Sequence, residues 1–129
     1  MASPMATRQT QQRRAREQAG RRAEASAALW LQLKGYRILD RRARTPHGEI
    51  DLVALRGNIL AFIEVKARAR HETALEAVTP ELRHRVERAA QMWAARKRGM
   101  DTRNWRFDVV AIVPGRLPHH LRDAWRPER

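Results

Sequence analysis

The chain contains no cysteine, which excludes disulfide bonds, cysteine-based metal sites and thiol catalysis. Aromatic residues make up only 5% of the sequence. The longest strongly apolar runs, such as residues 59–63, are far shorter than the roughly 20 residues of a membrane-spanning helix. No apolar stretch follows the first charged residues, so we expect no secretory signal, no membrane partner and a cytoplasmic location.

Acidic residues are scarce relative to basic ones. The 129 residues include 14 Asp and Glu against 27 Lys and Arg, for a formal net charge of +13. Only three of the basic residues are lysines, so 24 are arginines, whose planar guanidinium can bind two phosphate oxygens at once. This charge favours a nucleic-acid partner. An anionic membrane surface is the weaker alternative, because no basic helix has a clean apolar face, and an arginine-rich genome would explain the composition without any partner.

The length fits one domain, and a hydrophobic content of 43% is sufficient for a core. We expect residues 1–16 to form a flexible basic arm and residues 17–129 to form the single domain. Periodicity predicts helices from about Ala15 to Lys34 and from Thr79 to near Gly99, and strands over residues 36–44, 49–55, 59–67 and 107–113. This α-β-β-β-α-β order predicts an α/β layered fold.

The hairpin of residues 49–67 is the most informative segment. Gly57-Asn58 fits a two-residue turn, which places Asp51 opposite Glu64 and Glu49 opposite Lys66. Opposite residues share a face, so we expect these carboxylates and the lysine to cluster at the end of the hairpin far from its turn. The same pairing puts them on a face with Val53, Leu55, Leu60 and Phe62, and puts Ile50 and Leu52 on the other. Since both faces are apolar, the hairpin is predicted to be interior.

Two carboxylates close together at the edge of a core repel each other unless a cation lies between them. A Mg²⁺ or Mn²⁺ ion held by Asp51 and Glu64 would resolve the repulsion, and Lys66 could orient the attacking water or neutralise the charge that develops on a phosphate. The alternative is a structural salt bridge, in which Lys66 neutralises Glu49 or Glu64 without catalysis.

Glu24 lies on the apolar stripe of the first predicted helix, three residues before Ala27. Two interpretations stay open for it: a carboxylate at the core edge paired with an arginine, or a further metal ligand or orienting group that reaches the same acidic cluster. The arginines predicted to contact nucleic acid flank the acidic segment or follow the second helix start: Arg41, Arg42, Arg44, Arg68, Arg70, Arg83 and Arg85.

The segment Gly48-Glu49-Ile50-Asp51-Leu52, followed by Phe62-Ile63-Glu64-Val65-Lys66, resembles the UPF0102 (YraN-like) family. Residues 20–31, 35–39, 77–80 and 106–110 carry the same resemblance, which extends from about Gly20 to Trp125. That family is similar to archaeal Holliday-junction resolvases and to the PD-(D/E)xK, restriction-endonuclease-like group. The resemblance implies a restriction-endonuclease-like core with a mixed sheet covered by helices on both faces.

The resemblance also implies a metal site formed by Asp51, Glu64 and Lys66, with Glu24 matching the acidic residue of the first helix. Two functions follow. The first is a Mg²⁺-dependent nuclease that hydrolyses phosphodiesters in DNA, including branched DNA. The alternative is a nucleic-acid-binding protein whose acidic cluster is vestigial or structural. A homodimer would suit a branched substrate, although no residue pattern specifies one.

Overall fold

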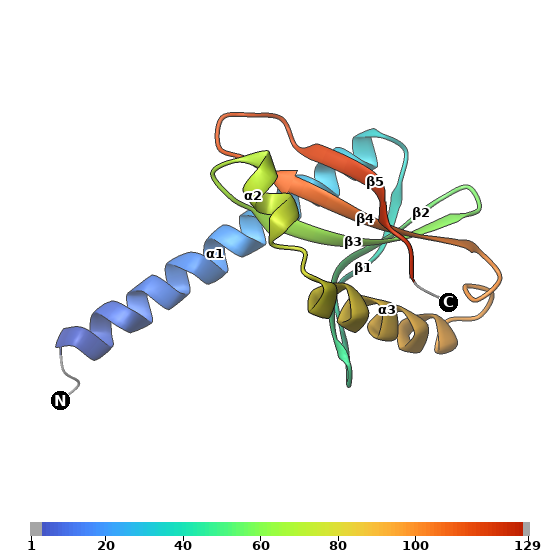
Figure 1. Cartoon of the computed structure of the whole chain (residues 1–129), viewed down its shortest axis with the longest axis horizontal. Helices are drawn as coiled ribbons and strands as arrows, with labels where there is room; N and C mark the ends of the chain where they lie inside the picture. The colour runs from blue at the N-terminus through green and yellow to red at the C-terminus, as the bar shows by residue number, and fades with distance from the viewer. Residues whose placement is uncertain (1–3, 128–129) are drawn as a thin grey trace.

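The chain forms a five-stranded mixed sheet with helices packed on both of its faces (Figure 1). The computed structural model describes residues 4–127. Its elements, in chain order, are α1 (Pro4–Leu33), β1 (Arg37–Thr45), β2 (Gly48–Arg56), β3 (Ile59–Ala67), α2 (His71–Glu76), α3 (Pro80–Ala95), β4 (Asn104–Ile112) and β5 (His119–Trp125).

The sheet has the order β1-β2-β3-β4-β5. Strands β1, β2 and β3 form an antiparallel meander, β3 and β4 are parallel, and β5 adds antiparallel to β4 at the edge. The connection between the parallel strands contains α2 and α3, as a crossover between parallel strands requires. The predicted α/β class is confirmed. The predicted order omitted α2 and β5, because α2 has only six residues and β5 is a largely polar edge strand.

Short local signals set the boundaries of several elements. Gly35 follows the end of α1 with a φ of +91°, and Gly57 forms the β2–β3 turn with a φ of +58°, a region that glycine enters without steric cost. Thr79 caps α3, since its hydroxyl accepts a hydrogen bond from the Leu82 amide at 3.3 Å, and Pro80 occupies the first helical position. These boundaries agree with the sequence prediction.

Helix α1 begins at Pro4 and not at about Ala15, so the predicted start of this helix is wrong. Residues 4–16 are its first turns, and residues 1–3 lie outside the described residues. The reason is intrinsic propensity: residues 5–19 contain neither proline nor glycine and are rich in Arg, Gln and Ala, which favour helix even without an apolar stripe. Although α1 is long, none of the helices within residues 4–127 is apolar enough over a sufficient length to span a bilayer.

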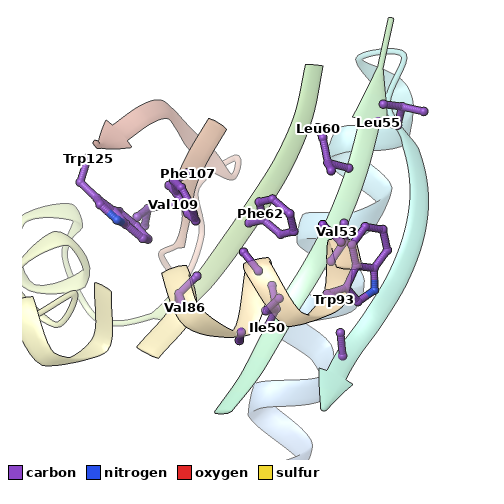
Figure 2. Packing of buried hydrophobic residues seen from close by; sticks show 14 of the residues in the cluster. Ile50, Val53, Leu55, Leu60, Phe62, Val86, Trp93, Phe107, Val109 and Trp125 are labelled. Carbon is purple, nitrogen blue, oxygen red and sulfur yellow. The ribbon is translucent and has the colours of Figure 1, made fainter. Parts of the chain in front are cut away.

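Two apolar clusters cover the two faces of the sheet. Helix α3 packs on one face, where Phe62 lies among Trp93, Trp105 and Phe107 with ring centroids 5.2–5.9 Å apart. Figure 2 shows this cluster between the sheet and α3. The second half of α1 packs on the other face against residues of β2, β3 and β4: Leu52, Ala54, Ala61, Ile63 and Val110. The interior placement of the β2–β3 hairpin is therefore confirmed.

A polar group is buried between β4 and β5. Asp108 is fully buried and accepts hydrogen bonds from the Arg106 guanidinium at 2.8 and 2.9 Å and from the backbone amide of Asp123 at 2.9 Å. The His120 ring also contacts this carboxylate, with 2.8 Å between Nε2 and Oδ2. Burial alone would raise the pKa of Asp108, but the hydrogen bonds from His120 and Arg106 outweigh it, so that the pKa is lowered. These hydrogen bonds stabilise the charged form of the Asp108 carboxylate, which therefore has a structural role.

Phe62 offers a test of the α3-side core. Replacing it with Ala removes the ring that three other aromatic residues contact, and the cavity left behind should lower the free energy of unfolding by about 3–5 kcal/mol. Urea denaturation measures this loss. Leu117→Ala is the control, because Leu117 is exposed and its truncation should change stability by about 0.5 kcal/mol or less. Similar losses of stability in the two variants would contradict the packing of Phe62 among these aromatic rings.

Candidate metal and nucleic-acid site

The β2–β3 hairpin has the predicted register near its turn. Arg56 pairs with Ile59, Leu55 with Leu60, and the pairing continues to Leu52 and Ile63. No further Cα pair joins these strands, so Asp51 and Glu64 lie just beyond the end of the ladder. There the Asp51 side chain replaces a backbone acceptor: its Oδ2 accepts a hydrogen bond from the Val65 amide at 2.8 Å.

The carboxyl groups of Asp51 and Glu64 are in direct contact, as the sequence predicted. One side-chain hydrogen bond joins them, Glu64 is only 6% exposed, and Asp51 is partly buried. Lys66 lies beside them, with its Nζ 3.3 Å from Glu64 Oε1. The strand alternation of β3 thus brings an acid and a base to the same place from positions two residues apart.

The environment of this pair disfavours two negative charges. Burial, followed by the negative charge of Asp51, raises the pKa of Glu64 from 4.5 to about 8, although the Lys66 ammonium opposes the shift. Burial also raises the pKa of Asp51, against the stabilising hydrogen bond from the Val65 amide. At neutral pH and without a metal ion, Glu64 therefore retains a proton and donates it in a hydrogen bond to the Asp51 carboxylate.

A cleft of about 390 Å³ opens onto this pair. Helix α1 forms one wall and the end of the hairpin forms the other; the lining residues are Arg16, Ala19, Gly20, Ala23, Glu24, Asp51, Glu64, Val65, Lys66, Ala67 and Arg68. The cleft is thus bounded by the acidic pair and by three basic residues from two elements of the chain.

Glu24 has the arginine partner of the first interpretation, and within residues 4–127 it does not form a three-carboxylate metal-ligand group with Asp51 and Glu64. Its Oε2 accepts a hydrogen bond from Arg42 Nε at 2.6 Å, so it has an arginine partner. It also lines the cleft, and its negative charge contributes to the raised pKa of Asp51. The pairing depends on Arg42, whose positive φ of 50° is uncommon for a residue with a side chain.

Two details of the predicted hairpin are wrong. Glu49 is not opposite Lys66: it pairs with Arg44 of β1, and its Oε2 lies 3.6 Å from Arg44 Nε at an exposed position. Ile50 belongs to the α3-side cluster together with Val53, so strict alternation breaks between these residues. Alternation therefore does not decide where Asp51 points. Its cleft is bounded by α1, which covers the face opposite α3, and not by the cluster around Val53.

The predicted phosphate-binding arginines do not gather at one place. Arg68 lines the cleft and is exposed. The Arg42 guanidinium forms an ion pair with Glu24, and the Arg44 guanidinium lies near the Glu49 carboxylate. Arg83 donates to the Val78 carbonyl at 3.2 Å and lies over the Trp125 ring.

The remaining three lie elsewhere on the surface. Arg41 and Arg70 are exposed in β1 and just before α2, without a contact to the cleft. The Cβ of Arg85 lies 3.8 Å from the position that a Cβ on Gly48 would take, so Arg85 flanks the β1–β2 turn. Among these seven arginines, only Arg68 lines the acidic cleft directly.

The sequence analysis missed Arg16 and Gly20, because it assigned the arginine to an arm and the glycine to no role. The signal was present in the helical spacing, since Arg16, Gly20 and Ala23 recur at intervals of four and three residues. The predicted helix from about Ala15 already contains all three residues, so their common side could have been inferred from the sequence.

The donor set fits a hard divalent ion such as Mg²⁺ or Mn²⁺. Within residues 4–127 no three Asp, Glu or His side chains converge on one point, so a site enclosed by protein ligands is not formed there. Asp51 and Glu64 supply two carboxylates at an open cleft. Mg²⁺ is commonly held by one or two carboxylates, with its other positions filled by water and substrate phosphate.

Comparison with known proteins gives one family. A profile described as "Uncharacterised protein family UPF0102" matches residues 23–112. The chain is 52% identical to a UPF0102 protein of Maricaulis maris, over 92% of this chain and 93% of that protein. It is 56% identical to a UPF0102 protein of Caulobacter vibrioides over 82% and 85% of the two chains, and 46% identical to one of Paramagnetospirillum magneticum over 97% and 96%.

The titration of Glu64 predicts a pH-dependent stability without metal. Because folding raises the pKa of Glu64 from 4.5 to about 8, the folded protein retains a proton that the unfolded chain loses in this window. Stability therefore falls as pH rises through the window, by at most about 1.4 kcal/mol per pH unit. Glu64→Gln has no such proton, so its stability relative to the wild type should increase with pH.

Urea denaturation in EDTA, at several pH values between 4.5 and about 8, measures this difference. Glu49→Gln is the matched control, because Glu49 is an exposed carboxylate outside the acidic cleft. A difference between the wild type and Glu64→Gln that is the same at every pH would show that the buried pair does not share a proton.

Proposed function

This chain belongs to the uncharacterised family UPF0102, and we propose that it is a Mg²⁺-dependent nuclease that hydrolyses phosphodiester bonds in DNA. The observation that carries the proposal is the contact between Asp51 and Glu64 at the bottom of a cleft, in a chain with a net charge of +13. A basic protein that attracts polyanions has at this place the two carboxylates that a divalent ion requires. A cytoplasmic location, where such a substrate is available, is part of the proposal.

The contrast with Asp108 supports catalysis over the alternative of a structural cluster. Asp108 is a structural carboxylate, and its hydrogen bonds from Arg106 and His120 lower its pKa. At Asp51 and Glu64 both pKa values are raised, first by burial and then by the charge of Glu24 at Asp51 and the charge of Asp51 at Glu64, which the single ammonium of Lys66 does not offset. A group of charges that is unfavourable without a ligand is typical of a functional site.

The residues around the cleft have distinct roles in this proposal. A bound Mg²⁺ would act as a Lewis acid on the scissile phosphate and on a water molecule. Asp51 and Glu64 would hold it, and Val65 fixes the orientation of Asp51 through its amide. Lys66, at 3.3 Å from Glu64, is placed to orient the water that attacks phosphorus or to neutralise the phosphate oxygens as the bond to the leaving oxygen breaks.

Glu24 has a positioning role in the same proposal. Its bond to Arg42 holds that guanidinium against α1, at the side of the cleft, and its carboxylate adds negative charge near Asp51. A restriction-endonuclease-like arrangement of the core is part of the proposal as well. It is supported by the order α1-β1-β2-β3-α3-β4 and by the parallel pairing of β3 with β4.

The activity is tested with labelled four-way junction, flap, single-stranded and duplex DNA, and with matching RNA, in Mg²⁺ or Mn²⁺. We expect cleavage of at least one DNA form. Asp51→Asn and Glu64→Gln should each lower the rate at least about 100-fold, because each removes a ligand from a site that has two carboxylates. Lys66→Met should lower the rate while leaving Mn²⁺ binding, measured by calorimetry, in place.

Glu49→Gln is the control for lost negative charge, since Glu49 lies on the same strand but outside the acidic cleft. Its cleavage rate should equal that of the wild type. Absence of cleavage of every DNA and RNA substrate, or cleavage that Asp51→Asn leaves intact, would refute the proposed nuclease activity. Salt-dependent DNA binding that survives both acidic substitutions, without cleavage, would favour the binding protein instead.

A further inference from the structure

The first half of α1 projects from the rest of the molecule (Figure 1). Residues 7–19 are all exposed, and the buried core residues of α1 begin at Ala23. A polar helix that buries no apolar face gains little stability from tertiary packing. Packing in the core therefore does not explain the residue types on the surface of this half of α1. This part of α1 also precedes the segment that the family profile matches, residues 23–112.

One side of this projecting half continues the wall of the acidic cleft. Arg16 lines the cleft, and Arg13 lies three residues earlier on the same side of the helix. Within residues 4–127, neither guanidinium has an ion pair or a hydrogen bond to another residue. Glu17, the acidic residue of this half, lies four residues after Arg13 and lines a neighbouring cleft that shares Gly20 and Glu24 with the acidic cleft.

Gly20 lies one turn beyond Arg16 on the same side. A glycine within a helix costs roughly 1 kcal/mol relative to alanine, so it usually indicates a close contact or a required space. Here no atom lies within 4 Å of the position that its Cβ would occupy, so the packing of the protein does not exclude a side chain. The glycine instead leaves open space in the cleft wall beside Glu24 and Asp51.

We propose that Arg13, Arg16 and Gly20 form a track on α1 that guides one phosphodiester strand into the acidic cleft. The two guanidinium groups contact successive phosphates, Gly20 leaves room for the strand to pass, and Arg68 contacts it from the opposite wall. Residues 7–19 extend about 20 Å along the helix, the length of roughly six nucleotides of one strand. The track rests on the nucleic-acid binding in the proposed function, but does not depend on cleavage.

The track is tested on the full-length chain in EDTA, where no metal-dependent cleavage can occur. The affinity for labelled single-stranded DNA and RNA, and for duplex DNA, is measured by fluorescence anisotropy over a range of salt concentrations. Each phosphate contact contributes about 0.7 to the slope of log K against log salt concentration for a single strand. The double variant Arg13→Gln/Arg16→Gln should therefore reduce the slope by about 1.4.

The matched control is Arg14→Gln/Arg22→Gln. It removes the same charge from the same helix, but these exposed positions are on other sides and do not line the cleft. Its slope should stay close to that of the wild type, and circular dichroism should show equal helix content in all three proteins. Equal reductions in the two double variants, or no reduction in either, would overturn the track.

Gly20→Gln tests the open space separately. Glutamine favours helix more than glycine does, so the melting temperature should stay the same or rise, while the affinity for single-stranded DNA should fall several-fold. If the protein cleaves DNA, KM should rise more than kcat falls. Ala25→Gln, an exposed position of α1 outside the cleft, should bind like the wild type. Unchanged binding by Gly20→Gln would refute a strand in this space.

The experiments distinguish a wrong assignment of the track from a wrong assignment of nuclease activity. Cleavage and binding that the α1 variants leave unchanged would reject the track alone. Salt-dependent binding that follows the track variants, in a chain that never cleaves, would retain the track and reject the nuclease. Binding to vesicles of anionic phospholipid, with none to DNA or RNA, would overturn both.

Discussion

The candidate site depends on the contact between two carboxyl groups at the end of a β-hairpin ladder. Backbone pairing of β2 and β3 stops at Leu52 and Ile63, and the Asp51 carboxylate then accepts the next amide hydrogen bond from Val65. This places it against Glu64, where burial makes two negative charges unfavourable. The sheet thereby holds an arrangement that the two side chains would not adopt in water, and Lys66 only partly offsets it.

The molecule contains two buried acidic groups with opposite properties. Around Asp108, an arginine, a histidine and a backbone amide satisfy the carboxylate, so the charged form is favoured and the group stabilises the junction of β4 and β5. Around Asp51 and Glu64, fewer compensating groups are present and both pKa values are raised. The opposite directions of these shifts follow from the number of hydrogen-bond donors that the fold places around each carboxylate.

Helix α1 links the core to the cleft. Its second half packs Ala27, Ala28 and Leu31 against the sheet and thereby fixes the helix axis. Its middle supplies Glu24 and Gly20 to the cleft wall, and its first half extends outward with arginines. Because a helix transmits orientation along its length, burial of one end sets the direction of the exposed end.

The α/β fold class and the β2–β3 hairpin could be predicted from the sequence. The Gly-Asn turn determined the register of the hairpin from Arg56–Ile59 to Leu52–Ile63, which brings Asp51 near Glu64, because register is a local property of a strand pair. Only the tertiary structure decided that Glu49 pairs with Arg44, that Arg42 binds Glu24, and that Ile50 changes face. Those contacts depend on β1 and α1, which are distant in sequence from the hairpin, and on where the ladder ends. No local pattern encodes how far two strands stay paired, so the nearness of the two carboxyl groups was predictable from the sequence and the walls of their cleft were not.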